Sequence, residues 1–441
     1  MEKLVPREIE VDILSRLPAE TLIPSKRVCR TWRRLFRDNH FIDVHLRRQS
    51  IGFEEENEHS YYHKKRGSSR SSDSEDADTT EPIIHRRLSY VKDANSSSKV
   101  TSFLILGGSY VQAQNKSFYY GIYSDEKQHF TYKKLKATRN DNHLFTPNSE
   151  YSVVGSCNGL ICFSASYFSE LFINKDPVYA CNPITGEEFN LPRFMVNYQS
   201  QEALAMVNIA SGFGYVPLTN QYKVVRICYY GREALLVQVY TLGGSGSDEG
   251  WRTFRGDFDC LMPTDLTASP GVYANGALYW LNSEKDSNIV AFDLAKEEFH
   301  IIQPPSEFSV GKRHSYRLQV LGGCLCFVHQ RRGRYVNIWS LEKRSSNNNN
   351  RDNSSSQING FWNWTREFKI VWDAKWVSEY EPFALTERGH VLFWFNRTIL
   401  SLYDAKAKSV TKLMDGGDLG FKNLQAVPHI NSFVSLKALG M

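Results

Sequence analysis

The stretch NGLICF at residues 158–163 joins a tight turn to an apolar run, and this form recurs along the chain. The later copies are NGALYW (275–280), GGCLCF (322–327) and RGHVLF (388–393). Asn-Gly and Gly-Gly favour the positive φ angles of short hairpin turns, and a brief apolar run behind such a turn is typical of a buried strand. Each copy therefore predicts one β-hairpin.

The spacing of the copies indicates how many hairpins the chain holds. Gly276 and Gly323 are 47 positions apart, which matches the length of one propeller blade. The longer interval from Gly159 to Gly276 leaves room for a further blade, and residues ahead of Gly159 supply opening strands. A dozen or more short strands favour a propeller or a large closed barrel over a simple sandwich. We expect a mainly β propeller of about six blades over residues 100–437, closed by the apolar piece at 430–436.

Several segments of this region resemble a known family. They are SCNGLICF (156–163), VYACNPITGEEFNLP (178–192), GFGYVPLTNQYKVVRI (212–227) and HINSFVSLKAL (429–439). They look like the F-box-associated interaction domain of plant F-box proteins, which is related to kelch propellers. The resemblance implies a kelch-like propeller that recognises a target protein.

Two polar tracts interrupt the pattern. Residues 49–99 are rich in Ser, Asp, Glu, Lys and Arg, so we expect a flexible linker, because few apolar side chains offset the entropy of ordering. Residues 343–358 form an Asn- and Ser-rich insert, which we expect to be a disordered loop on one blade. His59 and His63 in the linker have the spacing of a helical metal pair, but no third ligand is nearby and no metal site is predicted.

Residues 1–48 have the periodicity of helices instead of strands. Apolar residues recur at three- and four-residue steps behind Pro6, which suits a first helical turn, and Pro18 ends that helix. Two further short helices follow, the last within a basic run from Lys26 to Arg37. So short a module cannot build a large core of its own, so part of its apolar surface should belong to an interface with another protein.

The order and spacing of residues in this module resemble the F-box, through Arg16-Leu17-Pro18, then Leu22, then Val28-Cys29-x-x-Trp32. The resemblance implies a small α module of three helices that docks on the Skp adaptor of an SCF ubiquitin ligase, in which a cullin holds the adaptor. Carried over by position, the residues that would face the adaptor or the small core behind it are Pro6, Ile9, Leu14, Leu17, Pro18, Leu22, Val28, Cys29 and Trp32. Pro24 departs from the family pattern and leaves open where the second helix joins the third.

Composition narrows the function classes. A net charge of +5 is small for 441 residues, so the charge alone does not indicate binding to nucleic acid or membranes. No apolar run approaches the roughly 20 residues of a membrane span, and the charged start lacks the apolar core of a signal peptide. We therefore expect a cytoplasmic or nuclear protein. The 8 cysteines include no CxxC pair, so reduced thiols are expected instead of zinc sites.

We expect neither catalysis nor a cofactor. Histidines beyond residue 100 are scattered, whereas a kelch-type copper oxidase needs clustered His and Tyr ligands. GGSGS at 243–247 does not match a hydrolase elbow, and the phosphate-binding glycine loop is missing from the sequence. Trp362, Trp364 and Trp376 lie beside the polar insert and outside the strand alternation, so they are our candidates for contact with a target.

Together these features favour a non-catalytic substrate-recognition subunit of an SCF ubiquitin ligase. Its helices would bind the adaptor, and its propeller would recruit a protein target for ubiquitination. The flexible linker would let the target sample several orientations. The alternatives are a propeller scaffold without a role in degradation, a glycan reader, or a kelch-type enzyme. Which target is bound, and by which face of the propeller, does not follow from the sequence.

Overall fold

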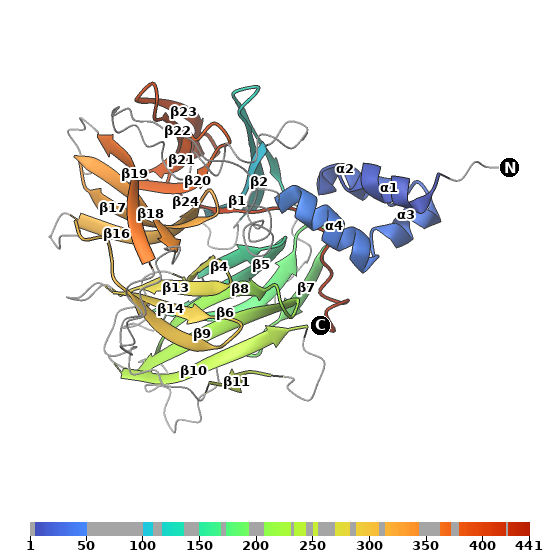
Figure 1. Ribbon diagram of the computed structural model, residues 1–441, viewed down its shortest axis with the longest axis horizontal. Helices are drawn as coiled ribbons and strands as arrows, with labels where there is room; N and C mark the ends of the chain where they lie inside the picture. The colour runs from blue at the N-terminus through green and yellow to red at the C-terminus, as the bar shows by residue number, and fades with distance from the viewer. Residues whose placement is uncertain are drawn as a thin grey trace, which may run out of the picture.

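The computed structural model places a group of helices at one side of a larger body of strands (Figure 1). It describes residues 5–50, 100–108, 117–135, 150–168, 173–193, 207–230, 233–243, 250–254, 270–282, 288–307, 314–343, 362–371, 379–419 and 422–441. Nearly all of the expected linker and insert lie outside these ranges. Within them, no helix is both long enough and apolar enough to cross a bilayer.

The N-terminal part is helical. Its helices are α1 (Arg7–Leu14), α2 (Ala19–Ser25), α3 (Arg30–Leu35) and α4 (Asn39–Ser50). Pro6 and Pro18 precede α1 and α2, and their carbonyl oxygens accept the first helical hydrogen bonds. Pro24 lies inside α2, which ends one residue later, so the join that the sequence left open follows Ser25.

The helix α4 was not expected, because the sequence analysis predicted three helices. Asp38 starts it: its Oδ1 accepts a hydrogen bond from the backbone N of Phe41 at 3.2 Å, which is the geometry of an N-cap. One face of the helix packs against the core through the buried side chains of Phe41, Ile42 and His45. The Asp before an apolar pattern was the available signal for this helix.

The strands form six four-stranded antiparallel sheets, which confirms the propeller of about six blades. Blade 1 comprises β24 (Lys422–Pro428), β1 (Val100–Gly108), β2 (Ser117–Ser124) and β3 (His129–Lys134). Blade 2 comprises β4 (Glu150–Cys157), β5 (Leu160–Phe168), β6 (Ile173–Asn182) and β7 (Glu187–Asn190), and blade 3 comprises β8 (Val207–Val216), β9 (Gln221–Tyr230), β10 (Glu233–Leu242) and β11 (Arg252–Thr253).

The remaining blades have the same order. Blade 4 comprises β12 (Val272–Ala274), β13 (Ala277–Leu281), β14 (Ile289–Asp293) and β15 (Glu298–Ile302). Blade 5 comprises β16 (His314–Leu321), β17 (Cys324–Arg331), β18 (Tyr335–Lys343) and β19 (Trp362–Val371), and blade 6 comprises β20 (Tyr380–Leu385), β21 (Val391–Phe395), β22 (Ile399–Asp404) and β23 (Ser409–Asp415). A short 3-10 helix, η5 (Gly416–Leu419), leads from β23 toward β24.

The repeated turns lie where the sequence predicted them, between the first two strands of a blade. Asn158 and Gly159 have φ angles of 50° and 85°, and Asn275 and Gly276 have φ angles of 49° and 77°. These positive angles are the reason that Asn-Gly recurs there. Gly159 also has no room for a side chain, because a Cβ atom would collide with Ser432 from the end of the chain.

The ring closes through its innermost strands. Each of β24, β4, β8, β12, β16 and β20 contacts the next, and β20 contacts β24. The C-terminal strand β24 pairs antiparallel with β1, with Val427 opposite Leu104, so both ends of the propeller sequence build blade 1. The expectation that residues 430–436 close the ring was wrong: β24 does so, and 430–436 lie beyond it outside any strand.

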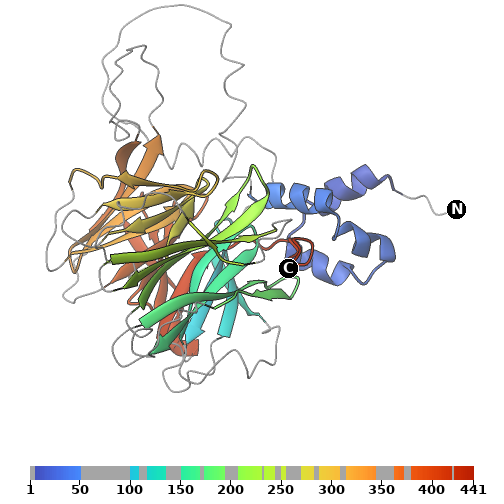
Figure 2. The ribbon, with the colours of Figure 1, turned by 90° about the horizontal axis from the view of Figure 1, so that it is seen from below.

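The C-terminal segment, residues 429–441, joins the propeller to the helices instead (Figure 2). The Phe433 ring stacks on Phe36 with a centroid distance of 5.4 Å and an interplanar angle of 9°. One apolar cluster combines residues of the helices, of blades 2 and 3 and of this segment. The helices therefore have a defined position on the propeller, whereas the expected flexible linker lies almost entirely outside the described residues.

Candidate functional site

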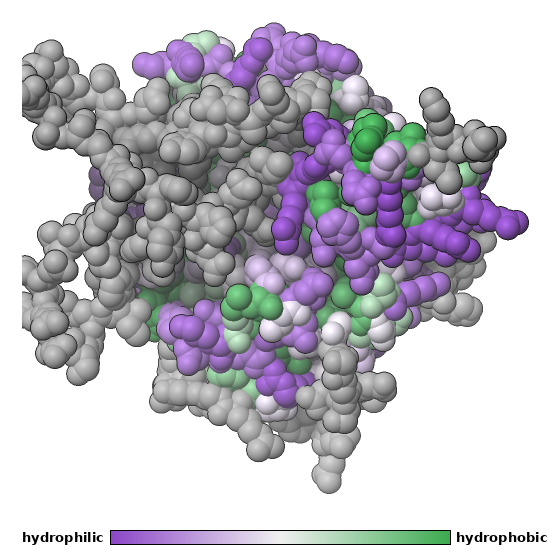
Figure 3. Space-filling view, turned by 45° about the vertical axis from the view of Figure 1, so that its right-hand side comes forward, coloured by the Kyte–Doolittle hydropathy of each residue, from purple (hydrophilic) through white to green (hydrophobic). Residues whose placement is uncertain are grey.

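A row of exposed apolar side chains runs along α1 and past its ends. Its members are Val5, Ile9, Ile13 and Leu17, spaced four residues apart, together with Val28 before α3, and they are between 38% and 68% exposed. In Figure 3, apolar patches stand out among hydrophilic side chains on the side of the molecule that carries the helices. We call these five residues the apolar row. Several exposed apolar side chains on one small module are typical of a protein interface.

The nine residues that the sequence analysis assigned to adaptor binding divide into two groups. Pro6, Ile9, Leu17, Pro18, Val28 and Cys29 are exposed, whereas Leu14 and Leu22 are buried behind them and Trp32 is half-buried. The structure thus brings six of the nine to the surface and places three in or against the core. Sequence reasoning left Val5 and Ile13 out of the site, although their four-residue spacing from Ile9 was a usable signal.

Cys29 shows why the chain has Val28-Cys29-x-x-Trp32 at this point. The Cys29 Sγ accepts a hydrogen bond from the backbone N of Trp32 at 3.3 Å, so the thiol acts as the N-cap of α3. The cap fixes the direction of α3, on which Trp32 packs against the core while Val28 remains outside. The motif therefore places one exposed and one half-buried apolar side chain four positions apart.

The buried His45 holds the end of α1 in place. Its Nε2 lies 3.0 Å from the carbonyl oxygen of Leu17, and its ring packs against Phe41 and Phe433. Burial lowers the pKa of His45 to about 4, so the ring is neutral at physiological pH. A neutral ring donates from Nε2 to the Leu17 carbonyl and so holds the backbone of this residue of the apolar row in place.

The helices that carry the apolar row hold charges of both signs, with Glu8 and Glu10 in the first turn of α1. Most of the basic run is exposed, namely Arg27, Arg30, Arg33, Arg34 and Arg37. Lys26 instead points inward, with its Nζ 4.8 Å from the centroid of the Phe433 ring, and burial lowers its pKa. Asp12 pairs with Arg16 at 3.0 Å and Arg48 at 2.7 Å, and these hydrogen bonds hold the pKa of its carboxyl below the usual range.

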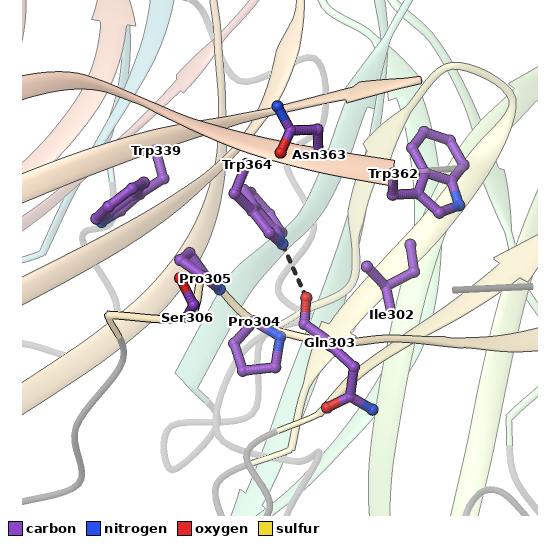
Figure 4. A pocket seen from close by; sticks show the side chains of 9 residues that line it. All are labelled: Ile302, Gln303, Pro304, Pro305, Ser306, Trp339, Trp362, Asn363 and Trp364. Carbon is purple, nitrogen blue, oxygen red and sulfur yellow. Dashed lines mark hydrogen bonds between the residues drawn. The ribbon is translucent and has the colours of Figure 1, made fainter. Parts of the chain in front are cut away.

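A second candidate site is an aromatic pocket of about 230 Å³ between the outer edges of blades 4 and 5. We call it the tryptophan pocket, and it is lined by Ile302, Gln303, Pro304, Pro305, Ser306, Trp339, Trp362, Asn363 and Trp364 (Figure 4). Trp364 donates a hydrogen bond from Nε1 to the carbonyl oxygen of Gln303 at 2.8 Å. The structure thus brings two of the three tryptophans proposed from the sequence together. The third, Trp376, lies outside the described residues.

The described residues include no group of three or more His, Cys, Asp and Glu side chains that could hold a metal ion. Two histidines of blade 5 do meet, with the Nδ1 of His314 lying 2.8 Å from the Nε2 of His329. Burial lowers the pKa of His329 to about 4. Burial raises the pKa of the Cys181 thiol to about 12, so this thiol is protonated at neutral pH.

Comparison with known families divides the chain as the structure does. Residues 3–46 match the family described as F-box-like, and residues 110–413 match the F-box associated beta propeller domain. An Arabidopsis thaliana F-box protein is 24% identical over 94% of this chain and 88% of its own length. An Arabidopsis thaliana F-box/kelch-repeat protein is 27% identical, over 44% of this chain and 49% of its own length.

A solved structure with a similar arrangement of strands is the beta-propeller domain of Cps50 (Swd1) from Myceliophteria thermophila. It is 10% identical, with a TM-score of 0.32, over 68% of this chain and 82% of that chain. So distant a likeness carries no argument about what this chain binds.

Proposed function

We propose that this chain, which belongs to the plant F-box proteins that carry an F-box-associated β-propeller, is the substrate-recognition subunit of an SCF ubiquitin ligase. The observation that carries the proposal is the apolar row on the F-box helices. F-box domains generally bind Skp-family adaptors, and Ile9, Ile13 and Val28 are exposed where such a partner would cover them. Through that adaptor the chain would be held by a cullin.

The proposed mechanism is proximity. A receptor that holds its target beside a ubiquitin-conjugating enzyme raises the effective concentration of the target's lysines, so the receptor needs no catalytic residue of its own. The packing of Phe433 between the F-box and the propeller supports this mechanism. A fixed distance between the adaptor and the target keeps the effective concentration high, whereas a freely moving tether would dilute it.

The proposed target-binding surface includes the tryptophan pocket. Its strand β19 lies on the side of the propeller away from the F-box helices in both views of the ribbon (Figures 1 and 2). A target bound there would not compete with the adaptor for space. Trp362 and Trp364 are half-buried in this pocket and keep part of their rings accessible.

Adaptor binding is tested with the purified full-length chain and an immobilised Skp-family adaptor. Ile13→Asp and Val28→Asp each place a charge in the expected apolar interface and should weaken binding by about a hundredfold. Both side chains are exposed, so neither change should unfold the F-box. Leu218→Asp is the matched control, because Leu218 is 86% exposed on a propeller turn and should leave binding unchanged.

If the wild-type chain fails to bind the adaptor, the ligase proposal is wrong and a propeller scaffold becomes the better interpretation. If Leu218→Asp weakens binding as much as Val28→Asp, the apolar row is not the docking surface.

A further inference from the structure

We propose that one end of blade 5 captures an acidic segment of a protein target, whose carboxylates bind Arg331, Arg334 and Lys369. We call these three residues the blade 5 cations. The proposal rests on the proposed function in one respect, namely that the propeller captures a protein. It adds the charge of the captured segment and the residues that receive it.

Two rows of side chains cross one face of blade 5 at this end. The outer row consists of directly opposed residues of β16 to β19, namely His314, Arg331, Tyr335 and Val371. The inner row is built in the same way from Tyr316, His329, Asn337 and Lys369. Alternate residues of a strand share a face, so both rows lie on the same side of the sheet. Further along this face, Leu318 and Phe327 pack into the core against blade 4. The face therefore changes from apolar core to a polar, partly exposed end.

This end of blade 5 points away from the F-box. In blade 2, the turn between the first two strands lies on the F-box side, because Ser432 donates a hydrogen bond to the carbonyl oxygen of Asn158 there. All six blades have the same strand order, so the corresponding turn of blade 5, at 322–323, lies on that side too. His314 begins β16 and Arg331 ends β17, which places the outer row at the opposite ends of these strands. Blade 5 also lies across the propeller from the helices in both ribbon views (Figures 1 and 2).

The blade 5 cations have no acidic partner among the described residues. Arg334 and Lys369 are exposed and Arg331 is half-buried. Arg332, in the same turn as Arg331, differs because it pairs with Glu379 at 2.8 Å. A carboxylate that binds at this end therefore meets positive charge that the protein has left unmatched, which favours an acidic partner over a neutral or basic one.

The rest of the chain at this end does not reverse the sign of the charge. Three connections between strands run there outside the described residues, at 283–287, 308–313 and 372–378. By sequence they carry four basic residues, Lys285, Lys312, Arg313 and Lys375, and three acidic residues, Glu284, Asp286 and Asp373. Their sum is one positive charge, which adds to the blade 5 cations.

The side chains beside the cations form a neutral and rigid floor. His329 is 4% exposed, and its Nε2 lies 2.8 Å from the Nδ1 of His314. The His329 ring stacks on Tyr316 with centroids 5.0 Å apart, and Tyr335 meets it at 88° with centroids 5.6 Å apart. Burial lowers the pKa of His329 to about 4, so this ring is uncharged at neutral pH. A floor that is already packed loses little conformational entropy when a ligand binds.

The surface fits a protein segment better than single-stranded nucleic acid. Bases bind by stacking on free aromatic faces, whereas the rings of His329 and Tyr316 stack on each other. Val371, beside Tyr335, is 68% exposed and offers an aliphatic contact for an apolar side chain of a peptide. Three unpaired cations are also few for a phosphate backbone, because proteins that bind DNA tightly neutralise about six to ten phosphates.

The test uses fluorescence polarisation with the purified full-length chain and a fluorescein-labelled peptide of four Glu-Val-Gly repeats. The wild type should bind it saturably, and the affinity should fall as the salt concentration rises, because salt screens exposed charges. A matched peptide of four Gln-Val-Gly repeats differs only in charge and should bind at least about tenfold more weakly.

Two pairs of variants locate the site. Lys369→Glu should weaken binding of the acidic peptide by about tenfold, whereas Lys406→Glu makes the same change in net charge on the turn between β22 and β23 and should not. Val371→Lys adds a cation to the surface and should strengthen binding by about threefold, a gain that damage to the fold would not produce. Its control is Val410→Lys, since Val410 is 44% exposed on β23 of blade 6.

The proposal is overturned if the acidic peptide shows no saturable binding at millimolar concentration, if the Gln peptide binds as tightly, or if Lys369→Glu and Lys406→Glu have equal effects. Tighter binding of single-stranded oligothymidylate than of the acidic peptide overturns it as well. Adaptor capture is measured on the same samples. Absence of peptide binding with normal adaptor capture refutes this inference alone and leaves the ligase proposal standing.

Discussion

Replacing Phe433 by Ala should release the F-box helices from the propeller and let them open more often, while the propeller stays folded. Phe433 is 2% exposed, and its ring contacts Phe36, the His45 ring at 5.3 Å and the ammonium of Lys26 at 4.8 Å. Truncating a fully buried phenylalanine costs about 3–5 kcal/mol. Most of this loss should fall on the contact between the two parts, because the partners of the ring are F-box residues.

The rest of the C-terminal segment should stay on blade 2 in this variant. The Asn182 side chain donates hydrogen bonds to the carbonyl oxygens of Ser432 and Val434, at 3.1 Å and 2.7 Å. The hydroxyl of Ser432 donates to the carbonyl oxygen of Asn158 at 2.7 Å. None of these bonds involves the Phe433 side chain, so the propeller should remain closed in this variant.

Hydrogen exchange read by mass spectrometry measures the effect. A loss of 3–5 kcal/mol raises the opening equilibrium by about a hundredfold to several thousandfold, and the amides of α3 and α4 should exchange faster by that factor. Amides of the inner strand β4 should not change. Phe433→Leu is the matched control and should have a smaller effect, because it deletes fewer buried atoms. Unchanged exchange in α4, or an equal increase in β4, would refute the reasoning.

Other parts of the molecule lead to further predictions. Asp176→Asn leaves the Arg226 guanidinium buried without its counter-charge, which lies at 2.9 Å, and should lower the free energy of unfolding in urea by about 3–5 kcal/mol; a loss below about 1 kcal/mol would contradict the prediction. Burial holds the pKa of His45 and of His429 at about 4, below the unfolded value of about 6.5, so the native state binds fewer protons. Stability present above pH 6.5 should therefore fall between pH 6.5 and 4, by up to about 3 kcal/mol for each ring, and His429→Gln should flatten the profile. Among the cysteines described by the structure, Cys29 alone is exposed, so iodoacetamide should label it first and a bound adaptor should protect it; earlier labelling of a buried thiol would disprove this.

Local patterns predicted much of the propeller. Asn158-Gly159 and Asn275-Gly276 encode their turns through the backbone angles of two adjacent residues, so the hairpins could be placed without knowing what they pack against. The four-residue spacing of Ile9, Ile13 and Leu17 likewise defines a helix face from neighbours alone. A periodic pattern, however, does not say whether its face is covered. Only the structure separated the exposed Ile9 from the buried Leu14.

The tryptophan pocket could be predicted from the sequence only in part. The sequence drew attention to Trp362 and Trp364 because they lie beside the polar insert, and this pointed to a surface role. The expectation that they stand outside the strand alternation was wrong, because both belong to β19. The walls that complete the pocket, Pro304 and Pro305, come from the previous blade, some 60 residues earlier. Contacts between blades depend on how sheets pack, which strand periodicity does not specify.

What the sequence by itself determined were the elements whose geometry depends on nearby residues: the hairpins, the first F-box helices and their family. Tertiary structure alone decided how the parts are joined. The Asn431 side chain donates to the carboxylate of Glu20, which is 411 positions away, and Asn182 binds Val434 across 252 positions. Residues 430–436 looked like a closing strand because most of their larger side chains are apolar, and apolar character favours burial but does not specify the partner. Strand β24 already pairs with β1 at the open edge of blade 1, so residues 430–436 cannot pair there. Phe433 packs against the F-box instead.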